Sequence, residues 1–326
     1  MSTDLVLVTG AGGFIGSHLT ERLVRDGKRV RAFVHYNASG SLRWLERSPV
    51  LKDIEVVAGD IRDYDSVSNA VKGATTVYHL AALIGIPYSY VSPLAYLRTN
   101  IEGTYNILQS CRLSECPNVM ITSTSETYGT AQFVPITELH PCVGQSPYSA
   151  TKIAADQLAI SFHRSFGLPV KIVRPFNTYG ERQSARAIIP TVISQLLSGK
   201  KTLTLGNLTP TRDLTYVADT VEGFMAIAQT PACVGEAVNI GMGKEVSIKD
   251  LALLIAKVVG VDIEFATDEQ RVRPNASEVE RLLCDNSKLK RLTGWEPKHS
   301  LAEGLANIVA WMKLHLDQYK PDVYNV

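Results

Sequence analysis

Tyr148 and Lys152 have the residue types and the spacing of an acid–base pair. Four residues are about one helical turn, so both side chains would project from the same face of a helix. A free tyrosine has a pKa of about 10, and a fall of roughly 3, or about 4 kcal/mol, would let it act as a base near neutral pH. A nearby ammonium and a second positive charge could together cause that fall. We therefore predict proton transfer at a substrate hydroxyl; in isolation the two would be ordinary surface residues.

Thr124 and Glu126 belong to a second polar cluster, which directly follows the apolar run Val119–Thr122. Runs of Ser and Thr are usually turns, but a glutamate has little use in such a turn unless it pairs or reacts. Oxidation of a carbinol needs only a hydroxyl partner for the tyrosine. The added carboxylate therefore predicts a second proton transfer, such as removal of a carbon-bound proton followed by elimination.

The segment Gly10–Gly16 lies between a predicted strand and a predicted helix. Glycines let the backbone approach a pyrophosphate, and the start of the helix offers free N–H groups and a positive dipole end. A tight turn without a ligand has a similar composition, but this position and spacing favour a dinucleotide site, whose oxidised nicotinamide would be the second positive charge. The predicted ligands in this turn are Gly10, Gly13, Phe14, Ile15 and Gly16.

The residues after the second predicted strand leave the type of dinucleotide open. NAD sites usually have an acid here, which accepts a hydrogen bond from the ribose 2′-hydroxyl. In this chain Val34 is followed by His35 and Tyr36, with no carboxylate. Arg43 could meet a 2′-phosphate, and His35 and Tyr36 could equally pack against adenosine. We expect NAD as the cofactor, with NADP as the alternative.

The elements that position these residues alternate between strands and helices. This alternation predicts an α/β fold, a Rossmann-type doubly wound parallel sheet with helices on both faces. In such sheets, ligands bind outside the carboxyl ends of the strands. The strands are expected at 5–9, 29–34, 54–58, 76–79, 119–122 and 170–173, and the helices at 16–25, 65–71, 98–113 and 148–166.

After Asn177 the alternation loosens, which predicts a smaller α/β substrate-binding lobe. We divide the chain into a dinucleotide-binding domain over residues 1–177 and a nucleotide-sugar-binding lobe over 178–326, and expect a segment near 212–240 to return to the first domain. The elements expected after Asn177 are helices at 187–197, 248–259 and 301–316, and short strands at 202–205 and 237–239.

Composition narrows the class of protein. The 33 Lys and Arg residues balance 32 Asp and Glu residues, so we expect no binding to nucleic acid or to an anionic membrane. The apolar runs are shorter than the roughly 18 residues that span a membrane, and the first ten residues do not have the pattern of a secretory signal. Five cysteines without a Cys-x-x-Cys pair predict neither a disulfide framework nor a metal site. A cytoplasmic enzyme fits these features.

Together, these motifs resemble those of the extended short-chain dehydrogenases/reductases, in the NAD-dependent epimerase/dehydratase family. The resemblance covers nearly the whole chain and implies that Thr124, Glu126, Tyr148 and Lys152 are catalytic. Besides the residues above, it rests on Gly59–Ile61, His79–Ala82, Asn100–Thr104, Arg174–Gly180, Arg212–Asp219 and Gly294–Pro297.

Within this family, Ser123-Thr-Ser-Glu126 is typical of sugar-nucleotide 4,6-dehydratases and of UDP-glucuronate decarboxylases, whereas 4-epimerases generally lack the acid. The stretches TAQFVPITE, RPFNTYG and LTPTRDLTYV are most similar to dehydratases of the legionaminic acid pathway, which act on GDP- or UDP-linked N-acetylglucosamine. The resemblance therefore implies a 4,6-dehydratase that recycles its cofactor. The alternatives are a UDP-glucuronate decarboxylase, a 4-epimerase and a non-catalytic dinucleotide-binding protein.

The resemblance also implies a set of binding residues and a homodimer, which family members usually form through helices corresponding to 98–113 and 148–166. Tyr148 and Lys152 would contact the cofactor as well as the substrate. The further cofactor contacts are Asp60, Ile61, Leu80, Ala81 and Ala82. The substrate contacts are Thr124, Ser125, Asn177, Arg186, Arg212 and Arg273, of which the guanidinium groups match phosphate oxygens.

Overall fold

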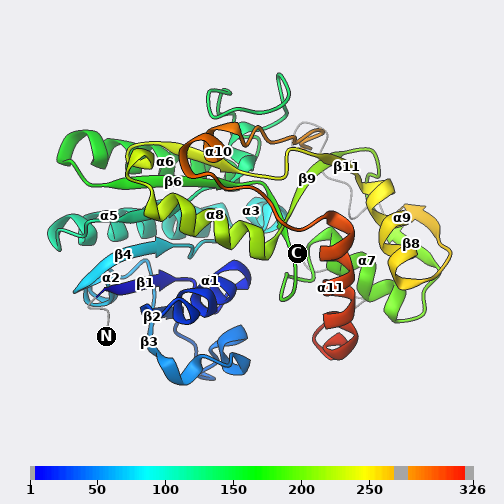
Figure 1. The fold of residues 1–326 in the computed structure, drawn as a ribbon, viewed down its shortest axis with the longest axis horizontal. Helices are drawn as coiled ribbons and strands as arrows, with labels where there is room; N and C mark the ends of the chain where they lie inside the picture. The colour runs from blue at the N-terminus through cyan, green and yellow to red at the C-terminus, as the bar shows by residue number, and fades with distance from the viewer. Residues whose placement is uncertain (1–3, 268–277, 320–326) are drawn as a thin grey trace.

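The main sheet consists of seven parallel strands in the order β10-β6-β5-β4-β1-β2-β3 (Figure 1). The structure is a computed structural model that describes residues 4–267 and 278–319. The predicted Rossmann-type α/β fold is confirmed. The strands are β1 (Leu5–Thr9), β2 (Arg29–His35), β3 (Ile54–Gly59), β4 (Ala74–His79), β5 (Val119–Thr122), β6 (Val170–Pro175) and β10 (Ala237–Ile240).

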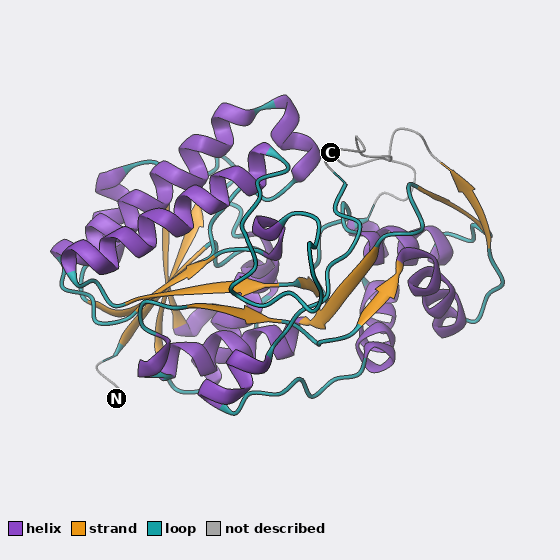
Figure 2. Ribbon diagram, turned by 90° about the horizontal axis from the view of Figure 1, so that it is seen from above, coloured by secondary structure: helices purple, strands orange, loops and turns teal. Residues whose placement is uncertain are grey.

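Helices cover both faces of this sheet (Figure 2). The central strand β1 is buried along its whole length, and its alternate side chains enter two separate cores. Val6 and Val8 belong to the core beneath α1 (Phe14–Arg25) and α8 (Val217–Gln229). Leu7 belongs to the opposite core. The helices on that side are α2 (Tyr64–Val71), α5 (Gly103–Leu113) and α6 (Pro147–Phe166).

The strand order reverses between β1 and β4, because the chain proceeds outward from β1 to β3 on one side and from β4 to β6 on the other. In open parallel sheets, the carboxyl ends of the strands at such a reversal, here β1 and β4, are the usual ligand position. The glycine turn follows β1, and the polar cluster at Thr124 follows β5, the next strand beyond β4. The topology therefore collects the predicted site residues at one edge of the sheet.

The smaller lobe has its own core, built on two small sheets in the orders β11-β9-β7 and β12-β8. The segment 237–239, expected among the later short strands, is β10 and lies in the main sheet, because Val238 and Ile240 pack in the core under α8. The lobe strands are β7 (Asn177–Tyr179), β8 (Thr202–Leu205), β9 (Thr211–Tyr216), β11 (Glu245–Ser247) and β12 (Glu264–Thr267). The helices that follow β7, besides α8, are α7 (Ile188–Leu197), α9 (Ile248–Val259), α10 (Ser287–Thr293) and α11 (Leu301–Leu314).

The chain is helical over the predicted residues 98–113, but its first part is a π-helical segment, η3 (Leu97–Glu102), which runs into α5. Within η3, the buried Asn100 donates to the Leu83 carbonyl oxygen (3.0 Å) and accepts from the Leu83 N–H (2.9 Å). The loop after β4 is thereby tied to the start of the helix. Two short helices, α3 (Ile86–Val91) and α4 (Pro93–Tyr96), complete this connection.

Within residues 4–267 and 278–319, no helix has the length and apolarity to cross a membrane. The same ranges contain no cluster of three or more His, Cys, Asp or Glu side chains arranged to hold a metal ion.

Candidate active site

The glycine turn folds back against the end of β4, so two predicted cofactor segments are in contact. Gly10 has a φ of +69°, a left-handed conformation that favours glycine. A Cβ there would lie 2.9 Å from the backbone nitrogen of Ala81. Ala81 is held in turn, because its N–H donates to Thr9 Oγ1 over 3.2 Å. The turn and residues 80–82 therefore form one surface.

The start of α1 fits a phosphate group. Gly13 is the N-cap residue, no side chain caps it, and the first turn contains no acidic residue. The first N–H groups of a helix have no partners within the helix and carry a positive dipole. A Cβ on Gly13 would meet only the Gly10 carbonyl oxygen, at 3.1 Å, and otherwise open space. At Gly16, in contrast, a Cβ would overlap the Gly10 carbonyl. Gly16 therefore closes the turn, while Gly13 leaves room for a ligand.

Asp60 and Ile61 follow β3 at the same edge of the sheet. Ile61 is buried and packs where Gly103 of α5 has no side chain. The Asp60 carboxylate accepts hydrogen bonds from the Arg62 guanidinium at 3.0 Å, and these bonds hold the pKa of Asp60 below its usual value. An ionised carboxylate thus lies one strand away from the exposed His35 at the end of β2.

Helix α6 begins with a capping box that fixes the orientation of Tyr148 and Lys152. Ser146 Oγ accepts the Ser149 N–H, and Ser149 Oγ accepts the Ser146 N–H, at 3.1 and 3.0 Å. Such caps contribute about 1 kcal/mol. Tyr148 and Lys152 are both buried on this helix. The Lys152 Nζ donates to the Thr122 carbonyl oxygen at 2.6 Å, so the lysine is anchored at the carboxyl end of β5.

The protein alone does not lower the pKa of Tyr148. Burial raises this pKa well above 10, the nearby Glu126 carboxylate adds to the rise, and a hydrogen bond with Thr124 opposes it. Burial also lowers the pKa of Lys152 to about 8. The Lys152 ammonium, one helical turn away, is bonded to a backbone oxygen, so the fall in the pKa of Tyr148 would have to come in part from the second positive charge that the sequence predicts, the oxidised nicotinamide.

Thr124 and Glu126 lie beside Tyr148, at the start of the short 3-10 helix η4 (Ser125–Tyr128). Thr124 Oγ1 accepts the Glu126 N–H at 3.2 Å, which leaves its own proton free to donate to Tyr148. Glu126 is half-buried, and within residues 4–267 and 278–319 the structure gives its carboxylate no ion pair. The structure thus brings all four predicted catalytic residues together, with a carboxylate available for proton transfer.

The predicted substrate contacts lie in different surroundings. Ser125 is buried in η4. Asn177 and Arg212 belong to neighbouring strands of the lobe, β7 and β9. The buried Oδ1 of Asn177 has no hydrogen-bond partner in the described part of the chain. Arg212 is buried and forms an ion pair with Glu278 at 3.1 Å.

The two remaining predicted substrate contacts are Arg186 and Arg273. Arg273 lies outside the described residues. Arg186 is exposed, and its guanidinium lies so close to Gly85 that a Cβ there would be 2.5 Å from Nη1. The ring of Tyr96 connects this arginine to the catalytic residues, since Tyr96 bonds to the Gly85 carbonyl oxygen and packs 6.2 Å from the Tyr148 ring. Arg186 is therefore placed at the rim of the site.

Sequence reasoning missed two buried residues next to the catalytic pair. Asn100 bonds to Thr151 of α6 over 3.0 Å as well as to Leu83, and so joins three segments around Tyr148. Asp156 follows Lys152 by one helical turn. The signals were present, in the Asn-x-x-Gly-Thr motif and in an acid at helical spacing after Lys152, but neither residue's burial is visible in the sequence.

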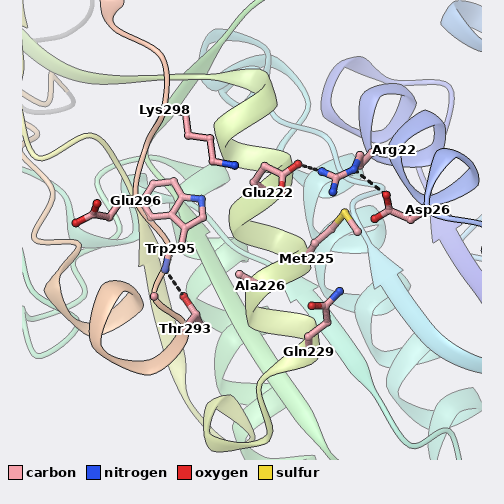
Figure 3. Close-up of a pocket in the computed structure, with 11 residues that line it drawn as sticks. Arg22, Asp26, Glu222, Met225, Ala226, Gln229, Thr293, Trp295, Glu296 and Lys298 are labelled. Atoms are coloured by element: carbon pink, nitrogen blue, oxygen red, sulfur yellow. Dashed lines mark hydrogen bonds and ion pairs between the residues drawn. The ribbon is translucent and has the colours of Figure 1, made fainter.

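A groove of about 260 Å³ lies on another part of the surface, between α1, α8 and the segment after α10 (Figure 3). Arg22 forms ion pairs with Asp26 and Glu222 in its wall. The Trp295 indole N–H donates to the Asp219 carbonyl oxygen at 3.1 Å, which fastens this segment to α8. The groove contains none of the predicted site residues, so it does not enter the catalytic argument.

The parallel sheet, the glycine turn and the Tyr–Lys pair define the class of extended short-chain dehydrogenases/reductases. A family model described as GDP-mannose 4,6 dehydratase matches residues 7–308, and the chain therefore belongs to this family. Its relatives are NAD-dependent sugar-nucleotide dehydratases or epimerases, so the protein is an enzyme.

Dehydratases and epimerases both occur among the curated relatives. A dTDP-glucose 4,6-dehydratase of Streptomyces griseus is 31% identical, over 98% of this chain and 97% of its own. A UDP-glucose 4-epimerase of Mycolicibacterium smegmatis is 33% identical, over 94% of this chain and 98% of its own. Overall identity does not separate dehydratases from epimerases.

Solved structures with the same fold also include both a dehydratase and an epimerase. A dTDP-glucose 4,6-dehydratase from Streptomyces venezuelae, solved with NAD bound, has a TM-score of 0.88 and 29% identity, covering 97% of this chain and 99% of its own. A UDP-glucuronic acid 4-epimerase from Bacillus cereus, in complex with UDP-glucuronic acid and NAD, has a TM-score of 0.86 and 30% identity, covering 95% and 99%. The fold is shared along nearly the whole chain.

The contrast between Gly13 and Gly16 gives a test of the cofactor turn. Gly13→Ala should weaken NAD binding at least roughly tenfold, about 1.4 kcal/mol, with little loss of thermal stability, because its Cβ enters space left for the ligand. Gly16→Ala should lower both the affinity for NAD and the thermal stability, because its Cβ overlaps the Gly10 backbone. Calorimetric titration with NAD and thermal unfolding measure the two effects. Wild-type affinity in Gly13→Ala would show that the ligand does not approach this residue.

Proposed function

We propose that this protein is a nucleotide-sugar 4,6-dehydratase that uses bound NAD and converts GDP- or UDP-linked N-acetylglucosamine to the 4-keto-6-deoxy sugar. The observation that carries the proposal is the half-buried Glu126 carboxylate beside Tyr148. A 4-epimerase needs only the tyrosine, whereas dehydration needs a second acid–base group. The N-acetylglucosamine substrate rests on the sequence stretches that resemble dehydratases of the legionaminic acid pathway.

The residues of the turn and of β4 would hold the cofactor. The free N–H groups after Gly13 would bind the pyrophosphate, and Ala81, which lies against Gly10, would border the same surface together with Ala82. Bound there, NAD would supply a hydride acceptor and donor for the sugar and a positive charge near Tyr148. Asp60 lies near the adenosine end, where an ionised carboxylate favours NAD over a 2′-phosphate.

The chain's own residues then move the protons. Tyr148 removes the proton of the 4-hydroxyl, while Thr124 donates a hydrogen bond to the 4-oxygen. Lys152 keeps a positive charge one helical turn from the tyrosine. The resulting 4-ketone acidifies the hydrogen on carbon 5, and Glu126 removes it. Glu126 then protonates the 6-oxygen, so that water leaves from carbon 6. Once the hydride has returned to carbon 6, a proton of solvent origin adds to carbon 5 and completes the 4-keto-6-deoxy sugar.

A 4-epimerase is the second candidate, because curated and solved relatives of this chain include UDP-sugar 4-epimerases. Such an enzyme would share the first oxidation and return hydride to the other face of carbon 4. Glu126 would then have no part in the reaction. A UDP-glucuronate decarboxylase shares the same first step and differs in its substrate.

A substrate panel separates these activities. The purified protein would be incubated with GDP- and UDP-N-acetylglucosamine, dTDP- and UDP-glucose, and UDP-glucuronate, and the products analysed by mass spectrometry. We expect loss of one water molecule from an N-acetylglucosamine nucleotide. Loss of carbon dioxide from UDP-glucuronate would indicate a decarboxylase, and an isomer of unchanged mass would indicate an epimerase. Either result in place of dehydration would contradict the proposal.

The role of Glu126 can be tested by one substitution. Glu126→Gln should lower the rate of dehydration by roughly 10²–10⁴-fold, because the amide cannot exchange the proton. Affinity for NAD should be unchanged, since Glu126 lies on the substrate side. Glu102→Gln, which removes an exposed carboxylate before α5, is the matched control and should keep the wild-type rate. Product formation at the wild-type rate in Glu126→Gln would rule out this residue as the base.

We also propose a homodimer formed through α5 and α6. Apolar side chains on these helices are exposed, and they include Tyr105 (43%), Leu113 (62%) and Phe166 (50%). Large exposed apolar patches mark interfaces in soluble proteins. Sedimentation should therefore give twice the chain mass, and Leu113→Asp should shift the protein toward the monomer. A wild-type monomer at micromolar concentration would refute this interface.

A further inference from the structure

Asp156 is a buried acid that the proposed reaction does not use. It lies on α6 one turn beyond Lys152 and is 1% exposed. Its Oδ2 atom accepts three hydrogen bonds, from Ser123 Oγ at 2.8 Å and from Arg174 Nε and Nη2 at 3.1 and 2.9 Å. Its Oδ1 atom has no hydrogen-bond partner in the described part of the chain. Removing a carboxylate from water is costly, so this arrangement calls for an explanation.

The end of β5 forms hydrogen bonds with both Lys152 and Asp156. Lys152 Nζ donates to the Thr122 carbonyl oxygen at 2.6 Å, and the hydroxyl of the next residue, Ser123, donates to Asp156. Residues four apart on a helix lie on the same face. Two consecutive residues of one strand end thus fix a buried ammonium and a buried carboxylate on neighbouring turns of α6.

Arg174 on β6 lies on the other side of Asp156. Its Nη1 donates to the Tyr128 hydroxyl at 3.0 Å, and this hydroxyl donates to Asn239 Oδ1 at 2.7 Å. Burial keeps the pKa of Tyr128 above its usual value, so the phenol stays neutral. Arg174 is therefore the cation that directly offsets the charge of Asp156.

The other titratable groups near Lys152 carry little or distant charge. His79 of β4 faces it, but burial lowers the pKa of this imidazole to about 3, so it is neutral. Tyr148 is a protonated phenol, and the Glu126 carboxylate lies beside it on η4. Burial lowers the pKa of Lys152 to about 8, and the Asp156 carboxylate opposes this effect. Among the residues 4–267 and 278–319, Asp156 is the anion that the structure couples to the ammonium.

We propose that Asp156 is a positioning residue that keeps the Lys152 ammonium charged during the proposed reaction, and that Arg174 limits the strength of this effect. The inference rests on the proposed function, in which Lys152 supports proton transfer at Tyr148. In a purely structural ion pair, Asp156 and Arg174 would not act on Lys152. Under the inference, they have opposite effects on the pH at which Lys152 loses its proton.

Two substitutions break the same ion pair and therefore distinguish these roles. Asp156→Asn removes the anion, so Lys152 should lose its proton at a lower pH, by about one pH unit. Arg174→Gln leaves the carboxylate without its cation, so Lys152 should lose its proton at a higher pH. A merely structural role predicts no displacement, or displacement in the same direction in both variants.

The titration of Lys152 can be measured without turnover. In protein labelled with ¹³C at lysine Cε, the resonance of Lys152 is assigned by its absence from Lys152→Met and then followed with pH. The pH dependence of kcat/KM is the second readout, since its alkaline limb reports the free enzyme. Tyr128→Phe, which removes one bond to Arg174 and changes no charge, is the control and should leave the titration in place.

The results test the coupling between Asp156 and Lys152 separately from the proposed function. Opposite displacements in Asp156→Asn and Arg174→Gln support the inference, and displacement in one direction or none overturns it. If these variants do not fold, Ser123→Ala keeps the ion pair but removes one donor to Asp156, and should move the titration to higher pH; an unchanged titration would contradict the inference. Opposite displacements in a protein that converts no nucleotide sugar would contradict the proposed function and not the coupling.

Discussion

The site depends on keeping one ammonium group charged out of contact with water. Lys152 is buried, and its Nζ is held at 2.6 Å from the carbonyl oxygen of Thr122. A strand end is suited to this task, because its last carbonyl groups are no longer used by the sheet. The capping box at Ser146 sets the direction of α6, and thus the side on which Lys152 meets β5. Without this contact, Tyr148 would be a buried phenol with a raised pKa and no nearby cation from the protein.

The parallel sheet places the other predicted site segments at the same edge as the bond between Lys152 and Thr122. Successive strands end at the same edge, so the glycine turn after β1, the loop after β4 and the cluster after β5 face one crevice. Asn100 fixes the loop after β4 to α6 through Leu83 and Thr151. The neighbouring lobe strands β7 and β9 carry Asn177 and Arg212, the two predicted substrate contacts of the smaller lobe.

Much of this frame could be predicted from the sequence, because it depends on local patterns. The β-branched runs gave the strands from β1 to β6 within a few residues, and helical spacing placed Tyr148 and Lys152 on one face. Features that depend on tertiary contacts could not be predicted. Examples are the π-helical segment around Asn100 and the ion pair that engages Arg212 with Glu278.

The sequence also could not show how burial changes the charges. The spacing of Tyr148 and Lys152 placed the ammonium one helical turn from the phenol, but it could not show that the ammonium is bonded to a backbone oxygen or that burial raises the pKa of the tyrosine. The buried acid Asp156 became visible only when α6, β5 and β6 were placed together. The chemistry of the pair therefore belongs to the fold as much as to the two residues.

The most direct test of the central claim, that Glu126 acts as a second acid–base group beside Tyr148, is turnover in deuterium oxide. Elimination through Glu126 exchanges the hydrogen on carbon 5 with the solvent, while the hydride that moves from carbon 4 to carbon 6 stays within the sugar. We predict a dehydrated product that carries one solvent deuterium at carbon 5, as read by mass spectrometry and proton NMR. A product without deuterium at carbon 5, or an isomer of the substrate, would contradict the claim.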